Sequence, residues 1–510
     1  LATRLGAADD DPAVALMQAL ALGSRHGFTD ENWALLRRTG TTHLVAISGL
    51  HVGLVAVLTL SVLRPLLSRL PQVGIAERAW PIAGSLGLLA ACGYAALAGF
   101  TLPTQRALIM LAVGVAALWL NRRLGTATAF GVALVLVLLW DPFATLSPGF
   151  WLSFLAVGAL IQVSRVRRLG ACRRWLELVR TQWAVGLGLM PCLALFFGEV
   201  NGLAPWVNLV AIPWFILILV PAVLLTTLLT LTLPADLSLV LAAVQGLCRW
   251  TLWGLDWIDS QVTVLWPLPE LPWVLMLLMG MAVALLALPI RYRGRSLLFV
   301  VLAAVCLWRP PALAPGAFTV TLWDVGQGLA ILIRTHSHSL VYDAGPSSAY
   351  GFDAGQAIVV PGLQAKAVKT PDLLMLSHGD NDHAGGAMAL RKAFPFMPML
   401  VGGVLDAPRG QRCRRGQQWR WDGVEFRVLY PPQGLQDSSN NLSCVMRIEG
   451  PGGSLLLTGD VERRAERRLL SSGELLAADV VLVPHHGSNS SSSTAFIAAV
   501  APSFALVAAG

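Results

Sequence analysis

The chain has 510 residues, of which 55% are hydrophobic and only 13% charged, with a mean hydropathy of +0.64. A soluble domain carries about 25% charged residues, so this composition excludes a single globular cytosolic protein, a disordered chain and a fibrous repeat. Residues 317–510 hold equal numbers of acidic and basic side chains, so the net charge of +8 lies in residues 1–316, between apolar stretches, where membrane orientation explains it better than nucleic-acid binding.

Residues 1–42 are expected to form an exposed lead-in to the apolar part of the chain. The second half of this segment is amphipathic, with Trp33 followed by Arg37 and Arg38. The sequence has neither an initiating Met nor a signal-peptide pattern, so we expect it to be truncated at the N-terminus.

Residues 43–308 are predicted to form a polytopic α-helical membrane domain. A spanning helix needs about 20 apolar residues, and ten stretches approach that length. They are 44–63, 81–100, 106–120, 127–140, 150–164, 182–198, 205–232, 237–258, 273–290 and 296–308. Several are short for a full crossing, so we expect re-entrant or broken helices among them, and the number of crossings is defined only to within one or two.

The arginines of this domain predict its orientation in the plasma (inner) membrane. They gather in the connections after the first, third, fifth and ninth stretches, while the connections between are neutral or acidic apart from Arg106. Cytoplasmic loops collect Lys and Arg, so odd-numbered stretches should end in the cytoplasm. Ten crossings then place the chain after residue 308 on the outer, periplasmic face, provided that 205–232 is one crossing or a re-entrant pair.

Residues 309–316 are rich in Pro and Ala and are predicted to be a linker. Two of the seven cysteines, Cys413 and Cys444, lie beyond it. The chain has no CxxC motif, so a thiolate metal site is not expected. On the oxidising face of the membrane these two cysteines could form a bridge, and two buried thiols are an equal alternative.

Residues 317–510 contain short β-branched runs separated by turn residues, with helical patterns near 384–394 and 461–470. Strands interleaved with helices predict an α/β or α+β domain built on sheet.

The sharpest chemical signal is the loop after the predicted strand 372–376, which holds His378, Asp380, Asp382 and His383. Four potential ligands between a strand and a helix can turn toward a common point. Imidazole and carboxylate suit divalent ions, and this density of ligands indicates two ions side by side. The alternative is a polar loop whose carboxylates cap the following helix.

Two further apolar strands lead to potential ligands. The predicted strand 454–458 is followed by Asp460, and the predicted strand 479–483 by His485 and His486. The carboxyl ends of strands are where α/β sheets hold their sites. A structural pair of histidines is the alternative for the second segment.

These motifs resemble the metallo-β-lactamase fold, an αββα arrangement, with Asp343 matching its early acidic turn. In more detail the chain resembles the ComEC family, the membrane channel of natural transformation. The matching segments are 43–53 (HLVAISGLHVG), 318–328 (FTVTLWDVGQG) and 440–443 (NNLS). Two features depart from that family: Leu329 stands where an acidic residue is usual, and the chain ends at Gly510 before the closing elements, which we expect to be truncated.

The resemblance implies two divalent metal ions. By position, the ligands would be His378, Asp380 and Asp460 for one ion and Asp382, His383, His486 and the shared Asp460 for the other. His486 is favoured over His485 as the ligand, with His485 facing a substrate phosphate. A carboxylate at Asp380, where most members of the fold have histidine, favours Mn²⁺ or Mg²⁺, and Zn²⁺ also suits the site.

Two cations can supply hydroxide and neutralise the charge that develops on a phosphodiester. Asp382 would orient the attacking water while it binds metal, and together with His485 it is the catalytic candidate. Asn441 and Ser488 could donate hydrogen bonds to phosphate oxygens, and turn hydrogen bonding is an equal alternative for both.

A segment from Arg409 to Trp421 pairs five arginines with two tryptophans. Guanidinium groups on the backbone and indoles on the bases can hold a single strand without sequence preference, so Arg412, Arg415 and Trp419 are candidate DNA contacts. A solvated hairpin loop is the slightly favoured alternative.

With the family resemblance, five polar or small membrane residues are expected to line the DNA path. They are His43, Ser48, Gly49, His51 and Arg106. The alternatives are an interfacial helix start for the histidines and snorkelling for the arginine.

The sequence thus predicts a membrane channel for single-stranded DNA whose outward domain hydrolyses the other strand with metal ions. One alternative is a channel with a non-catalytic binding domain, and another is a membrane-anchored metallo-phosphodiesterase without transport. The expected partners are DNA and membrane lipid, with a DNA-uptake receptor and a cytoplasmic motor implied by the resemblance alone.

Overall fold

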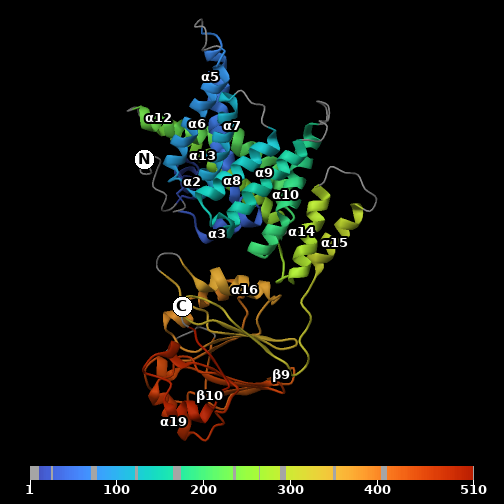
Figure 1. The fold of residues 1–510 in the computed structure, drawn as a ribbon. Coiled ribbons are helices and arrows are strands. Elements are labelled where there is room, and N and C mark those ends of the chain that lie inside the picture. Colours follow the sequence, from blue (N-terminus) through green and yellow to red (C-terminus); the bar gives the residue numbers. More distant parts are fainter. Residues whose placement is uncertain are drawn as a thin grey trace. The chain divides into compact units, whose positions relative to one another are not determined.

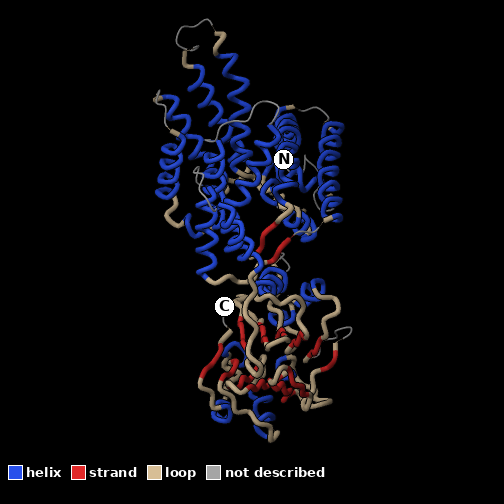
Figure 2. Tube along the Cα trace, turned by 90° about the vertical axis from the view of Figure 1, so that its right-hand side faces the viewer, coloured by secondary structure: helices blue, strands red, loops and turns tan. Residues whose placement is uncertain are grey.

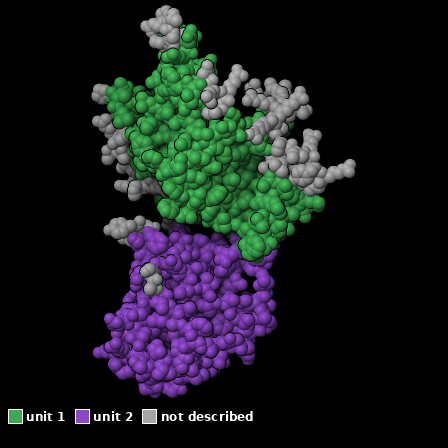
Figure 3. Space-filling model, in the orientation of Figure 1, with its two compact units in different colours: residues 1–267, 271–306 green, residues 268–270, 307–510 purple. Residues whose placement is uncertain are grey.

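The computed structural model describes residues 11–24, 27–70, 77–120, 125–164, 174–233, 237–262, 265–287, 295–348, 352–403 and 410–508. The chain separates into two compact units (Figure 3). Unit 1 holds Leu1–Pro267 and Leu271–Cys306, and unit 2 holds Leu268–Glu270 and Leu307–Gly510. The expected linker, 309–316, belongs to unit 2 and has neither helix nor strand.

Unit 1 consists of helices and one small antiparallel ribbon in the part of the chain that the structure describes (Figure 1). The ribbon pairs β1 (Glu199–Asn201) with β2 (Leu265–Pro267). The helices are α2 (Pro12–Leu22), α3 (Asp30–Arg38), α4 (Thr42–Val45), α5 (Gly49–Leu67), α6 (Ala79–Leu97), α7 (Leu102–Trp119), α8 (Thr126–Trp140), α9 (Pro148–Ser164), α10 (Arg174–Phe197), α11 (Ala204–Trp214), α12 (Val220–Thr232), α13 (Ser238–Gln261), α14 (Trp273–Ala287) and α15 (Arg295–Leu307).

Five of these helical runs are long and apolar enough to cross a membrane, by length and composition, among the described residues. They are Gly49–Leu67, Ala79–Leu97, Leu102–Trp119, Trp175–Phe197 and Ala204–Thr232. The last joins α11 and α12 through a π-helical turn at Phe215–Leu219. Its 29 residues rise about 43 Å, longer than a hydrocarbon core of about 30 Å, so this run is long enough for one full crossing.

The other predicted crossings coincide with helices that are shorter or less apolar. α8, α9, α14 and α15 have 13 to 17 residues. α13 is amphipathic, with Cys248 and Leu255 on its buried side and Trp250 and Trp257 exposed. The basic connections at 121–124, 165–173 and 288–294 lie outside the described residues. The side of the membrane that unit 2 occupies therefore stays a prediction.

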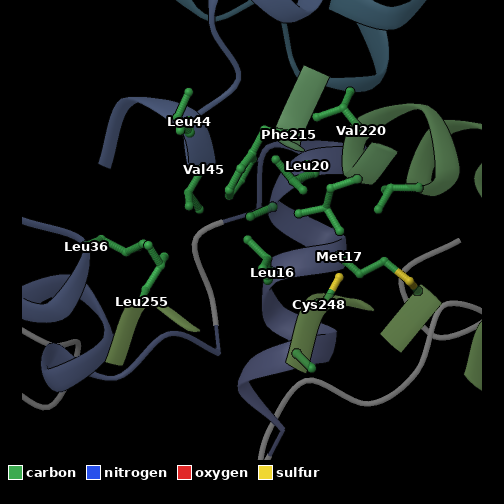
Figure 4. Close-up of a cluster of buried hydrophobic side chains, with 14 of the residues drawn as sticks. Leu16, Met17, Leu20, Leu36, Leu44, Val45, Phe215, Val220, Cys248 and Leu255 are labelled. Carbon is green, nitrogen blue, oxygen red and sulfur yellow. The ribbon is translucent and has the colours of Figure 1, made fainter. Parts of the chain in front are cut away.

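The expectation of an exposed lead-in is wrong for α2. All residues from Ala13 to Ala21 are buried, and the helix packs against α12 and α13 (Figure 4). Its segment has no charged residue on any face, which is typical of a helix surrounded by other helices. Asp11 caps it by accepting from Ala13 N (2.9 Å) and forms an ion pair with Arg249 (2.7 Å).

Unit 2 contains two six-stranded sheets that lie face to face (Figure 2). The first has the order β3-β4-β5-β6-β7-β8 and the second β14-β13-β12-β11-β10-β9. The strands are β3 (Thr319–Leu322), β4 (Ile331–Arg334), β5 (Ser339–Tyr342), β6 (Leu373–Leu376), β7 (Met399–Val401), β8 (Gln411–Arg412), β9 (Gln418–Trp421), β10 (Val424–Tyr430), β11 (Val445–Gly450), β12 (Gly453–Leu457), β13 (Val480–Leu482) and β14 (Phe504–Leu506).

Three buried clusters show that unit 2 has the predicted αββα layers. Side chains of both sheets, such as Met375 and Met446, form the middle cluster. Leu374 and Leu390 belong to the cluster that buries the outer face of the first sheet under helices, and Leu456 belongs to the corresponding cluster of the second. The helices are α16 (Val360–Ala365), α17 (Asn381–Ala384), α18 (Ala387–Ala393), α19 (Arg463–Ser471) and α20 (Thr494–Val500).

The two cysteines of unit 2 are joined. Cys413 follows β8 and Cys444 precedes β11, so their disulfide links the two sheets, with Cα atoms 6.1 Å apart. Both side chains are buried. Of the two alternatives left by the sequence, the structure contains the bridge.

Candidate metal centre

The ligand-bearing loops leave the sheets at the carboxyl ends of neighbouring parallel strands. β5 pairs with β6 in parallel, with Tyr342 opposite Met375, and β12 pairs with β13 in parallel, with Leu456 opposite Val481. Parallel neighbours end at the same edge of a sheet, where α/β folds place their sites. The loops after β6, β12 and β13 carry the predicted ligands.

Four of the six predicted ligands form one compact group: Asp382, His383, Asp460 and His486. One ligand atom from each lies within 4.8 Å of all the others. His383 Nε2 is 3.1 Å from Asp460 Oδ1 and 3.2 Å from His486 Nε2, and His486 Nε2 is 3.4 Å from Asp382 Oδ2. Two imidazoles and two carboxylates that converge in this way fit one divalent ion.

His383 is oriented by a buried carboxylate behind it. Its Nδ1 donates to Asp343 Oδ2 (2.8 Å), which leaves Nε2 facing the group. The same carboxylate accepts hydrogen bonds from Ser377 N (2.6 Å) and Oγ (2.7 Å). Burial alone would lower the pKa of His383, but Asp343 and Asp460 raise it to about 10. The sequence marked Asp343 only as an acidic turn, and the part played by Ser377 was missed.

His486 is held from its far side by the segment that follows β14. Its Nδ1 donates to the carbonyl of Ala508 (2.7 Å), so Nε2 is again the nitrogen that faces the group. The hydrogen bond between His486 and Asp382 lowers the pKa of Asp382 to about 2 and raises that of His486. The Asp382 side chain keeps one third of its surface exposed, so the group is open on this side.

His378 and Asp380 lie beside the group of four rather than within it. The His378 side chain is fully buried and its ring centroid is 4.3 Å from that of His383. Its Nδ1 is 3.0 Å from Ser377 Oγ, whereas Nε2 has no hydrogen-bond partner among the described residues and lies 3.5 Å from Asp380 Oδ2. A buried, unpaired ring nitrogen beside a carboxylate fits a second ion at this position.

His485 has a different environment from His486, although both have positive φ angles in the turn after β13. Its Nδ1 is 3.0 Å from Ser490 Oγ and 3.8 Å from Glu462 Oε1, and its Nε2 is 3.9 Å from Asp460 Oδ2. The ring therefore lies at the edge of the group. Ser488, a predicted phosphate donor, lies in the same turn with its hydroxyl 3.1 Å from Ser490 Oγ.

Leu329 has a structural role in place of the missing acid. Its side chain is buried, and its backbone N donates to the Asp382 carbonyl (3.0 Å). The preceding Gly328 has φ +151°, and a Cβ there would come within 2.5 Å of the same carbonyl oxygen. This segment therefore clamps the backbone of the ligand loop.

The side chain of Asn441, a candidate phosphate contact, has hydrogen-bond partners within the protein, and its contact with a phosphate stays a prediction. The amide nitrogen donates to Ser438 Oγ (2.9 Å) and Glu462 Oε2 (2.9 Å). The amide oxygen accepts from the backbone N of Glu462 (3.2 Å) and of Ala465 (3.3 Å). Asn441 is buried and caps the start of α19, which agrees with the turn alternative.

Trp419, the candidate base contact, packs within unit 2, and its contact with DNA stays a prediction. Its indole stacks on Phe426 at an angle of 4° and a centroid distance of 5.4 Å, and it packs against the buried cluster between the sheets. Trp421 likewise stacks on His338, at 5.0 Å and 8°. Both indoles sit on the strand β9, where alternate side chains point toward the core.

The two arginines of this hairpin make contacts within unit 2. Arg412 Nη1 donates to the carbonyl of Gly403 (2.6 Å), next to the His378 loop. Arg415 Nε lies 4.0 Å from Glu474 Oε1. Their contact with DNA stays a prediction.

The membrane candidates gather at the N-terminal ends of α5 and α7. His51 is buried, and neither ring nitrogen has a hydrogen-bond partner in the described part of the chain. Arg106 is 6% exposed, and a Cβ at Gly49 would lie 3.3 Å from the Cβ of Ala107. His43 lies in α4, and Ser48 immediately precedes α5. Their role in a DNA path stays a prediction.

Two models of known protein families match this chain. A family model described as "Competence protein" matches residues 20–293. The chain belongs to the competence protein family. A second model, "Metallo-beta-lactamase superfamily", matches residues 323–510. Both matches confirm the family and the fold class expected from the sequence motifs.

Relatives in the competence protein family extend over nearly the whole chain. It is 37% identical to competence protein ComA of Neisseria gonorrhoeae over 98% of this chain and 69% of that protein. Identity is 32% to the uncharacterized protein YcaI of Escherichia coli (90% and 61%) and 28% to ComE operon protein 3 of Bacillus subtilis (97% and 66%). The chain thus spans about two thirds of the length of these relatives.

Proposed function

We propose that this protein carries single-stranded DNA across the inner membrane and hydrolyses the strand that stays outside. Unit 1 is the conduit in this proposal, and the metal centre of unit 2 is the nuclease. Membership of the competence protein family, together with the metallo-β-lactamase domain, supports a role in DNA uptake. The group formed by Asp382, His383, Asp460 and His486 is the observation that carries the nuclease half.

The residues fit two divalent ions. Asp382, His383, Asp460 and His486 would hold one, and His378 and Asp380, with Asp460 shared, would hold the other. When bound, such ions lower the pKa of a water molecule and neutralise negative charge on a phosphodiester. The oxygen-rich side formed by Asp380 and Asp382 suits Mn²⁺ or Mg²⁺, and the three imidazoles also suit Zn²⁺.

The protein groups around the centre orient it and set its charge. Without cations, the carboxylates of Asp343, Asp380, Asp382 and Asp460 would repel a phosphodiester. Phosphodiester cleavage should therefore depend strictly on divalent ions. In this proposal Asp382 orients the attacking water, which is supported by its contact with His486 and its exposure on one side. In this proposal His485 faces the substrate phosphate, which is supported by its position at the edge of the group.

The membrane half of the proposal depends on the close approach of α5 and α7. A Leu at position 49 should push these helices apart, because Ala107 lies in contact distance of the added Cβ. Gly114, on α7, has no atom within 4 Å of a Cβ and offers a matched control. DNA uptake in cells should fall with Gly49→Leu and stay unchanged with Gly114→Leu. Unchanged uptake with both variants would remove the conduit.

The nuclease half is tested on the purified full chain with end-labelled DNA and Mn²⁺, Mg²⁺ or Zn²⁺. Asp382→Ala removes one ligand of the compact group, and we expect it to lower the rate of cleavage at least 100-fold and to weaken metal binding measured by equilibrium dialysis. Asp324→Ala changes an exposed carboxylate of the same unit and should do neither. Metal binding without cleavage under any of the ions would instead support a non-catalytic binding domain.

A further inference from the structure

We propose that a charged cleft beside the metal centre binds the next phosphate of the DNA strand being cut. This inference rests on the proposed nuclease function and adds the residues that hold the substrate strand. The cleft has a volume of about 520 Å³ and is lined by side chains at the start of α19 and in the loops that face it. Among its lining residues are Asp437, Glu462, Arg463, Arg464, Arg468 and Ser490.

His485 connects the lining of the cleft with the metal centre, because it contacts Ser490 and Glu462 of the lining and lies beside the metal ligand Asp460. On the cleft side, His485 Nδ1 is 3.0 Å from Ser490 Oγ and 3.8 Å from Glu462 Oε1. On the metal side, His485 Nε2 is 3.9 Å from Asp460 Oδ2. The cleft therefore adjoins the metal centre through His485, and we infer that a strand with one phosphate at the metal centre reaches the cleft with a neighbouring one.

The charges of the cleft favour an anion. Three arginines face two carboxylates, and those carboxylates are already engaged. Asp437 forms an ion pair with Arg468 (2.5 Å), and Glu462 accepts a hydrogen bond from Asn441 (2.9 Å). Glu462 keeps its negative charge in that hydrogen bond, so Arg463 and Arg464 leave the cleft with a net charge of +1.

These two guanidinium groups keep donors for a ligand. Arg463 donates from one terminal nitrogen to the Asn489 carbonyl (2.8 Å), which fixes the side chain and leaves its other donors available. Arg464 makes no hydrogen bond or ion pair within the residues that the structure describes. Guanidinium groups bind phosphate oxygens with two parallel hydrogen bonds, which a phosphodiester can accept.

The remaining lining residues indicate what part of a nucleotide enters. The described residues around the cleft are all polar or charged, with no aromatic or aliphatic side chain on which a base could stack. The backbone N–H groups of Glu462 and Ala465 are occupied by Asn441, so the arginine side chains and not the helix terminus would hold the anion. Contacts to phosphate position a strand without reading its sequence.

The test compares Arg464→Ala and the double variant Arg463→Ala/Arg464→Ala with Arg467→Ala in the full chain. Arg467 is an exposed arginine of the same helix that does not line the cleft, so it controls for charge and helix content. Binding of a labelled 12-nucleotide single strand is followed by fluorescence anisotropy in EDTA, which needs no cleavage. We expect roughly tenfold weaker binding for each arginine removed. The slope of the logarithm of the binding constant against the logarithm of the salt concentration should become smaller in magnitude by about 0.7 for each lost contact.

Cleavage then separates this inference from the proposed function. The small substrate bis(p-nitrophenyl) phosphate reaches the metal centre without filling the cleft, so both variants should cleave it as the wild type does. For the oligonucleotide, KM should rise roughly tenfold for each arginine removed. Unchanged binding and KM for the oligonucleotide would overturn the inference, and so would an equal loss on both substrates. A wild type that cleaves neither substrate, yet binds DNA through these arginines, would overturn the nuclease and leave the cleft standing.

Discussion

At the scale of single residues, the orientation of the His383 imidazole ring depends on a carboxylate that lies behind the metal centre. Asp343 is fully buried and accepts hydrogen bonds from His383 Nδ1 and twice from Ser377. Carboxylates of this kind fix the tautomer of a ligating histidine and make its other nitrogen a better donor to the metal.

Asp343→Asn should therefore weaken metal binding without preventing folding. The amide keeps the size of the side chain but not its charge, and one of its two polar atoms can no longer accept from Ser377 or His383. We expect a 10- to 100-fold loss of metal affinity in isothermal titration of the full chain. Asp324→Asn, at an exposed position, should retain wild-type affinity, and an equal loss in both variants would show that the effect is not specific to the centre.

Whether the environment of a site residue could be predicted from the sequence depends on whether its partners are close to it in the sequence. Asp382 and His383 are adjacent in one loop, so their proximity could be read from the sequence. The roles of Asn441 and Trp419 depend on partners brought together by the fold, Glu462 and Phe426. A polar amide next to a predicted site cannot show by itself that its hydrogen bonds are already made.

At the scale of elements, α19 and α20 are locked together by one buried acid. Glu466 in α19 accepts hydrogen bonds from Ser492 N (2.5 Å) and Ser493 N (3.0 Å), at the start of α20. These backbone groups have no partner inside their own helix, so the carboxylate completes its N-terminus. The same α19 carries the arginines of the cleft.

Glu466→Ala should lower the free energy of unfolding of unit 2 by about 2–4 kcal/mol, since two backbone donors would be left without acceptors in a buried place. This change in the free energy of unfolding is measured by urea titration of the full chain, in which protease digestion of unit 2 reports how much of it is unfolded. The matched control is Glu425→Ala, which breaks only an exposed ion pair with Arg427 and should cost less than about 1 kcal/mol. Equal stability of the two variants would contradict the role given to Glu466.

The positions of helices and strands could be predicted where a run of apolar residues marks them in the sequence. The apolar stretch 205–232 corresponds to one helical run, and the strands before Asp460 and His486 end at Leu457 and Leu482, each one residue before the predicted end. α2 was assigned to an exposed segment because the acidic residues 9–11 precede it and an amphipathic run that holds Trp33, Arg37 and Arg38 follows it. Its burial depends on contacts with α12 and α13, more than 190 residues away, which periodicity cannot show.

At the scale of the whole molecule, the chain joins two units with different physical chemistry. Unit 1 is apolar and carries the excess of positive charge, whereas residues 317–510 carry balanced charge and the metal centre. In the proposed function this division separates passage of one strand from hydrolysis of the other. The proposal requires unit 2 to lie outside the cytoplasm, because DNA must meet the nuclease before it crosses.

The side of the membrane on which unit 2 lies can be measured, and this measurement tests the proposed function. Two reporters are fused in turn to the C-terminus of the full chain. Alkaline phosphatase is active only outside the cytoplasm. Green fluorescent protein fluoresces in the cytoplasm and stays dark when it is exported in unfolded form. We expect an active phosphatase and no fluorescence from the fluorescent protein. A fluorescent fusion with an inactive phosphatase would place the metal centre in the cytoplasm and contradict the proposed division of labour.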